Sequence, residues 1–202
     1  MPTSDSLESI KRELRALDSS SREILFPCIS DGEVSAFESR HSILLPPEYR
    51  YFLTIVGNGG EEFFRLGEMD HGWEFAPWNE GDGFVGILGK PFQYSEEWND
   101  LAGYPEYDPQ RENDPQWIED YDRKRDEFDA RYFLPIDGAI PIAHLGCCIR
   151  LWLIVTGPER GNVWYDERAN LQGLKPLCRS DGSRLKFLDW CKGWATHQEC
   201  RR

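Results

Sequence analysis

The clearest structural signal in this chain lies at residues 45–60, which read LPPEYRYFLTIVGNGG. Pro47 suits the first turn of a helix, because the amide hydrogen that proline lacks would have no partner there. Large apolar residues then recur at helical spacing, at Tyr49, Phe52, Leu53 and Val56. The glycine-rich end at 57–60 stops the helix, because glycine and asparagine adopt the left-handed conformation that closes one. We therefore expect a helix over residues 47–56 that delivers the chain in a fixed direction into a strand.

Two further helices are expected before this stretch. A capping residue at Ser30 or Asp31 precedes Val34 and Phe37, which predicts a helix that ends before Ile43. Residues 1–18 place apolar side chains at spacings of three and four, which indicates a short helix at the edge of the core. Its apolar positions are Leu7, Ile10, Leu14 and Leu17.

The chain after residue 60 is expected to form mainly strands and a C-terminal helix. Aromatic residues and glycines alternate with acids over 61–89, which indicates two or three short strands. Residues 148–155, CIRLWLIV, form the strongest strand and should be central, and residues 161–166 return beside it. Because side chains alternate along a strand, Leu151 and Leu153 lie on one face and Trp152 and Ile154 on the other, so both faces should be covered. Ser183 is expected to cap the last helix.

Residues 91–132 look like an insertion into a single domain that spans 1–202. The first half of this segment is rich in prolines and aromatic residues and is expected to be an ordered loop. Asp114 and Pro115 then predict the start of a helix, and aromatic residues follow on one of its faces. They are Trp117, Tyr121, Phe128 and Tyr132.

The charge of the chain is concentrated in its middle third. The chain has 36 acidic and 23 basic residues, a net charge of −13. Residues 61–135 alone hold twenty acids and seven bases, so this third accounts for the whole excess. Such a field repels nucleic acid and raises the association rate with a basic partner, whereas the plainer reading is a solvated face that keeps the protein soluble.

Length and composition favour a soluble, cytoplasmic protein. At 202 residues the chain can build one core, and none of its apolar runs approaches the roughly 18 to 20 residues that span a bilayer. The N-terminus is polar and charged where a signal peptide would be apolar. Six cysteines are sparse for a disulfide scaffold, and reduced thiols are the simpler expectation.

Catalytic and cofactor motifs find little support. Residues 81–86 read GDGFVG, the G-x-G-x-x-G fingerprint, but a buried strand before it and a helix after it are not expected. The four histidines lack metal-ligand spacing, so no metal and no cofactor is expected. Two enzyme readings stay open, a base at His71 beside Asp70 and a thiol nucleophile at Cys147 or Cys148 with His144.

The 45–60 motif resembles the signature of the SUKH superfamily, which groups a fungal regulator of cell-wall synthesis with many bacterial immunity proteins. The similarity covers roughly 28–66 and 133–197. Further support comes from Phe37-Glu38, the IPIA run at 140–143 with Gly146, the GNV run at 161–163, and the FLDW run at 187–190. The chain departs from the pattern at Gly146-Cys147-Cys148, where the family often has a Gly-Gly-Asp-like turn, and at the 91–132 insertion. The resemblance implies an α+β fold, with helices packed around a mixed, largely antiparallel sheet, and a binding role without catalysis.

Together, the resemblance and the acidic middle third predict an immunity protein that binds and neutralises a cognate protein toxin of basic surface, often a nuclease. A non-catalytic regulatory scaffold similar to the fungal member is the alternative. We expect the partner surface on 61–82 and on the 106–129 part of the insertion, because aromatic anchors and steering charges occur there together. The candidate residues are Trp73, Glu74, Trp78, Glu80, Asp82, Glu119, Asp120 and Asp122.

Overall fold

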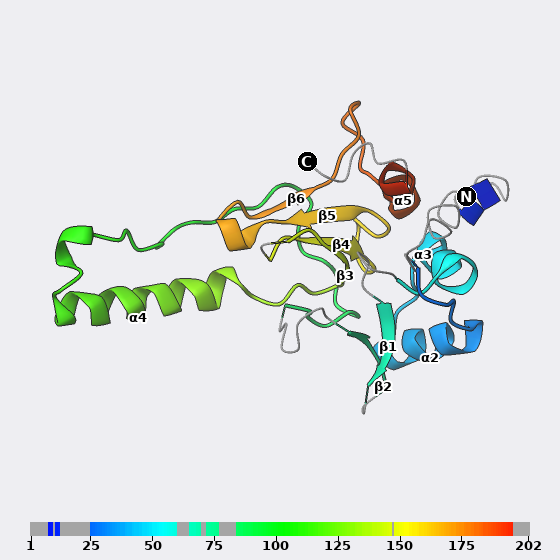
Figure 1. The fold of residues 1–202 in the computed structure, drawn as a ribbon, viewed down its shortest axis with the longest axis horizontal. Helices are drawn as coiled ribbons and strands as arrows, with labels where there is room; N and C mark the ends of the chain where they lie inside the picture. The colour runs from blue at the N-terminus through cyan, green and yellow to red at the C-terminus, as the bar shows by residue number, and fades with distance from the viewer. Residues whose placement is uncertain are drawn as a thin grey trace.

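A computed structural model describes residues 8–9, 11–12, 25–59, 65–69, 72–76, 84–146 and 148–195. Figure 1 shows the chain as a body of sheet and helices with one long helix extending from it. The elements, in chain order, are α2 (Asp31–His41), α3 (Pro47–Tyr51), the π-helix η1 (Phe52–Val56), β1 (Arg65–Met69), β2 (Gly72–Ala76), the 3-10 helix η2 (Pro109–Arg111), α4 (Pro115–Tyr132), β3 (Ala139–His144), β4 (Arg150–Ile154), β5 (Val163–Asp166), the 3-10 helix η3 (Arg168–Asn170), β6 (Leu174–Pro176) and α5 (Phe187–Ala195). Within these residues, none of the helices has the length and apolar character needed to cross a membrane.

The fold is α+β, as expected. Strands β3, β4, β5 and β6 form a four-stranded sheet in that order, and every neighbouring pair is antiparallel. Strands β1 and β2 form a separate antiparallel hairpin, which confirms strands in the 61–89 region. The parallel component is a single bridge between Val85 and Ile136 beside the sheet. Pro141 lies in the edge strand β3 next to a bulge, a position where its missing amide hydrogen costs little.

Strand β4 is central and buried on both faces. All five of its residues are buried, and it pairs with β3 on one side and β5 on the other. Leu151 and Leu153 belong to the larger core cluster beneath the helices, whereas Trp152 and Ile154 belong to the second cluster on the opposite face. The alternation expected from the sequence is therefore confirmed.

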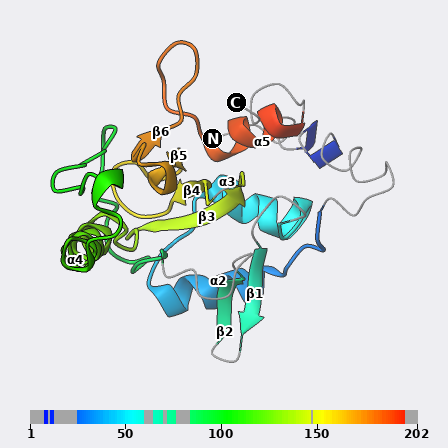
Figure 2. The same ribbon diagram turned by 60° about the vertical axis from the view of Figure 1, so that its left-hand side comes forward.

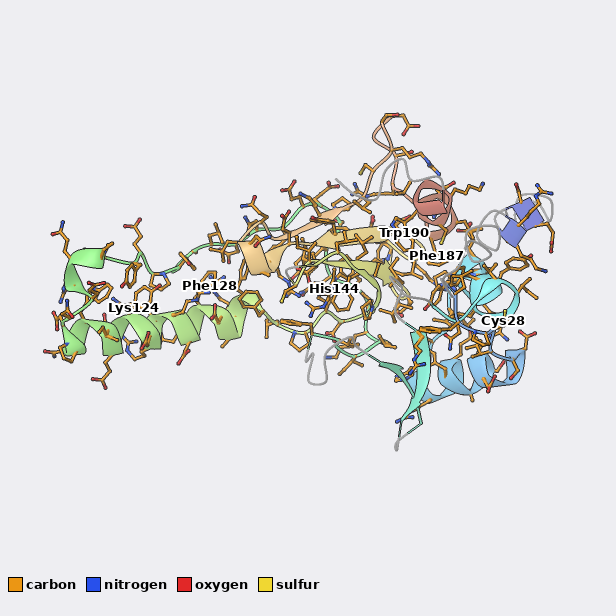
Figure 3. The ribbon with its side chains drawn as sticks, in the orientation of Figure 1. Cys28, Lys124, Phe128, His144, Phe187 and Trp190 are labelled. Carbon is orange, nitrogen blue, oxygen red and sulfur yellow. The ribbon has the colours of Figure 1, made fainter. Side chains whose placement is uncertain are left out.

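The first face of the sheet packs against α2, α3, η1 and α5. Ser30 caps α2 through a reciprocal capping box with Glu33. In Figure 3, Phe187 and Trp190 of α5 lie beside the sheet, and both side chains are buried in the larger cluster. Ser183 is not the cap of this helix, because α5 begins at Phe187 and the Ser183 amide and hydroxyl bind Asp181 in a separate turn.

The helix expected over 47–56 is α-helical only to Tyr51 and then continues as the π-helix η1. The amide of Gly57 donates to the carbonyl of Phe52 at 2.9 Å, which closes the wider π turn. Gly57 itself is extended, with φ of 177°, so it does not end the helix by a left-handed conformation. It is needed for space, because a Cβ there would lie 2.9 Å from the Phe26 carbonyl oxygen.

The second face of the sheet is covered by an extended segment, residues 84–98, which we call the strap. Its backbone pairs with Ile136 near β3 and with Leu174 in β6, and the amide of Phe92 donates to the Thr156 carbonyl at 2.9 Å. Phe92 packs its ring edge against Trp164, with centroids 4.8 Å apart. At the start of the strap, Gly86 lies against residues 136 and 137, where a Cβ would meet the Ile136 carbonyl carbon at 2.8 Å.

Candidate functional site

The segment predicted to be an insertion projects from the sheet as an arm, which we define as residues 99–132. Figure 1 shows the outgoing chain and α4 running side by side away from the body, and Figure 2 shows α4 nearly end-on. Asp114 caps α4 by accepting the amides of Gln116 and Trp117, and Pro115 occupies the first turn. Both features agree with the sequence prediction.

The base of the arm is tied to the sheet by buried polar and aromatic contacts. Tyr132 stacks on Trp98 with ring centroids 5.3 Å apart, and its hydroxyl donates to Asn99 Oδ1 at 2.6 Å. Arg168 donates to the carbonyl oxygens of Tyr132 and Leu134 at 3.2 and 2.9 Å, at the end of α4. These contacts determine the direction in which the helix leaves the body.

The outer part of the arm is held together by aromatic rings. Tyr107 contacts Trp117 and Tyr121 edge-on at 5.6 Å, and Trp117 stacks on Tyr121 at 5.3 Å. Tyr104 meets Phe128 edge-on nearer the body. Figure 3 shows Phe128 closer to the sheet than Lys124, so the rings follow the helix outward. The aromatic face of α4 therefore packs against the outgoing chain and leaves its other face to solvent.

Half of the acidic side chains on α4 are neutralised by neighbours. Asp120 binds Arg123 and also Lys124, the latter at 2.7 Å, and Arg123 binds Glu127 at 2.7 Å. Hydrogen bonds from Lys124 and then Arg123 lower the pKa of Asp120. Asp129 pairs with Arg125 at 3.0 Å. These carboxylates contribute little net field.

The other three acids form a row on the solvent face of α4. Glu119, Asp122 and Asp126 are all exposed, and no ion pair within the described residues involves them. Their spacing of three and four residues places them along one side of the helix. They line a shallow, open hollow whose end is formed by Pro115 and Ile118. We call Glu119, Asp122 and Asp126 the acidic row.

The structure divides the predicted partner-binding residues into three groups. Glu119 and Asp122 belong to the acidic row, whereas Asp120 lies on the ion-paired side of the same helix. Trp73 and Glu74 are described by their backbone positions in β2, opposite Glu68 and Gly67 of β1. The remaining candidates, Trp78, Glu80 and Asp82, lie outside the described residues.

Asp126 is the residue of the row that the sequence analysis missed. The signal was present in the spacing, since Asp126 follows Asp122 by four residues and has no basic residue three or four positions away on the row side. By the same rule, Asp120 is followed by Arg123 and Lys124 at exactly the pairing distances, which would have removed it.

The residues of the two enzyme readings are placed only in part. The Nδ1 atom of His144 accepts the amide hydrogen of Gly146 at 3.1 Å, so that nitrogen shapes a turn. Cys148 is exposed, and Cys147, Asp70 and His71 lie outside the described residues. Across the described ranges, no three His, Cys, Asp or Glu side chains come together as metal ligands.

Comparison with known proteins identifies the family. No curated protein and no solved structure gives a significant match to the chain. The family model of the SMI1 / KNR4 family (SUKH-1) matches residues 28–180, which is most of the chain and includes the 45–60 motif, the sheet and the arm. With the motif on its two-part helix and the antiparallel sheet beside it, the chain belongs to the SMI1 / KNR4 family (SUKH-1).

Proposed function

We propose that this protein is an intracellular immunity protein that binds a cognate basic protein toxin and neutralises it without catalysis. Family membership supports a SUKH-type protein, and the resemblance to immunity proteins within that superfamily favours this role over others. The acidic excess of the middle third gives an independent reason to expect a basic partner.

The acidic row on the arm is the observation that carries the proposal. Three exposed carboxylates without ion pairs stand on a helix that extends from the body, where a partner can approach them. A nuclease binds phosphate groups through basic side chains, so a rigid row of carboxylates competes for the same surface. Charges arranged in this way mainly raise the rate of encounter and determine orientation.

The direct test is co-expression with the toxin encoded by the neighbouring gene. Cells that carry the toxin should survive when this protein is present and die when it is absent. Purified protein should also form a complex with the toxin domain in size-exclusion chromatography. Equal killing with and without this protein contradicts the proposal, and capture of several host proteins in its place would favour the regulatory scaffold.

A further inference from the structure

We propose that the outer face of α4 is a docking surface for a basic amphipathic helix of the partner. This inference rests on the proposed function and adds the kind of element that binds at the arm. The surface consists of the acidic row together with Pro115 and Ile118 at the end of the hollow. In the complex, basic side chains of the incoming helix pair with the row, and an apolar side chain packs on Ile118.

The first argument is that this face of α4 is left open by the fold. On the opposite face, Phe128 and Tyr132 are 3% and 0% exposed, because they pack at the base of the arm. Ile118 is 37% exposed, although it is a large aliphatic residue on the same helix. An apolar side chain left in solvent among charges is typical of a recognition surface, in which apolar contact gives affinity and the rim gives orientation.

The second argument is the spacing of the charges. Glu119, Asp122 and Asp126 cover seven residues of helix, which corresponds to about 10 Å along its axis. A partner helix presents lysines or arginines at the same interval when they are three and four residues apart. Two helices pack with axes about 8–10 Å apart, close enough for such side chains to meet across the hollow.

The third argument selects a basic partner over the other occupants. A second copy would bring another acidic arm to the same face, and the row would repel it. Nucleic acid is excluded from this face for the same reason. The ion-paired side of α4, with Asp120, Arg123 and Glu127, has satisfied its charges within the helix and offers less to a basic ligand.

The experiment uses the full-length chain and two synthetic peptides of identical composition as probes. The first is a stapled helix with three lysines spaced by four and three residues and a leucine on the same face. The second has the same residues scrambled so that the lysines point in all directions. Fluorescence anisotropy in low salt should show tighter binding of the first peptide, and added salt should weaken it because exposed ion pairs are screened.

Matched variants of α4 locate the site. The triple variant Glu119→Gln, Asp122→Asn, Asp126→Asn should weaken binding of the first peptide about tenfold, since three exposed pairs of modest energy are lost. Ile118→Ser should weaken it as well, and circular dichroism should be unchanged because these side chains are exposed. The control variant Asp120→Asn, Glu127→Gln removes the same kind of charge from the paired side and should change binding less than about threefold.

Several outcomes overturn the inference. Equal binding of the two peptides shows that charge alone acts, and equal loss in the triple and control variants shows that the row has no special role. A dimer in sedimentation that Ile118→Ser dissolves assigns the face to a second copy instead. If the triple variant still binds and neutralises the toxin fully, this inference is wrong while the proposed function stands. If the wild-type protein fails to neutralise the toxin, the proposed function fails whatever the peptides do.

Discussion

Tyr49 places a hydroxyl in the core of the helical face. Its side chain is 2% exposed, its ring meets Phe187 edge-on at 4.9 Å, and its hydroxyl has no hydrogen-bond partner within the described residues. A buried hydroxyl without a partner costs about 1–3 kcal/mol. We therefore expect Tyr49→Phe to leave the free energy of unfolding unchanged or to raise it by up to about 1 kcal/mol in urea titrations. A loss of more than about 1 kcal/mol would contradict this, since the ring packing is kept.

The same residue predicts a difference at alkaline pH. Burial, and then the nearby Cys191, raise the pKa of the Tyr49 phenol, whereas the phenol in the unfolded chain ionises near pH ~10. The neutral phenol therefore favours the folded state below that pH, and its contribution is lost as the pH rises above it. Tyr49→Phe should lose less stability than the wild type between about pH 9.5 and 11, measured by thermal melting. Parallel curves for the two proteins would show that Tyr49 does not contribute.

Arg168 should be the most costly side chain to remove at the base of the arm. It forms a two-pronged pair with Asp166, at 2.9 Å for both contacts, and the two side chains are 3% and 4% exposed. Asp166 also accepts from Trp152 Nε1. Arg168→Ala leaves that carboxylate buried without its cation, which should cost about 3–5 kcal/mol of unfolding free energy. The exposed Arg179–Asp189 pair is the control, and Arg179→Ala should cost less than about 1 kcal/mol. Similar losses in both variants would contradict the account.

At the scale of elements, Gly173 determines how closely the strap approaches β6. Its φ is +72°, and a Cβ there would collide with the carbonyl oxygen of Trp98. Gly103 has a similar φ of +76° but nothing within 4 Å, so it reports the conformational cost alone. Gly103→Ala should cost about 1 kcal/mol, whereas Gly173→Ala should cost at least about 2 kcal/mol more in denaturant melts. Equal costs would mean that the strap yields without penalty.

The elements that the sequence predicted well are those with local signals. The starts of α2 and α4 depend on caps and prolines next to the helix, and the burial of β4 follows from an uninterrupted apolar run. The π turn after Tyr51 and the late start of α5 were missed, because they depend on contacts far along the chain. Gly57, for example, is placed by the backbone of Phe26. The site was predicted in part, since helical spacing was not used to separate paired acids from unpaired ones.

On α4 itself, the acidic row should control the rate of association. Reversal of Glu119, Asp122 and Asp126 to lysine should slow binding to a basic toxin and flatten its dependence on salt, because long-range steering is lost. Reversal of Asp120, which already pairs with Arg123 and Lys124, should slow it less. Stopped-flow measurements at several salt concentrations give both rates. An unchanged association rate at low salt in the triple reversal would move the interface to another part of the chain.

For the whole molecule, the arm extends the surface without contributing to the main core. Neither core cluster includes a residue of 99–127, although all of these residues are described. Tyr104 and Arg125 meet at the base, where the guanidinium donates to the phenol oxygen at 3.0 Å. A short linker can therefore join them, and its length changes the closure free energy only slowly. The direction of the arm was not predictable, because the strap sets it through contacts at Gly138 and Gly173.

Removal of residues 105–124, with a short glycine-serine linker from Tyr104 to Arg125, tests the insertion and the interface together. The sheet and its two clusters should persist, and the midpoint of unfolding should shift by an amount that corresponds to less than about 1 kcal/mol, since only solvent-facing structure is lost. Circular dichroism should show less helix, while toxin binding and protection of cells should be lost with the acidic row. A protein that no longer folds would show that the arm is integral to the domain. A protein that folds and still protects cells would show that the toxin binds the body, with the β1–β2 hairpin as the next surface to test.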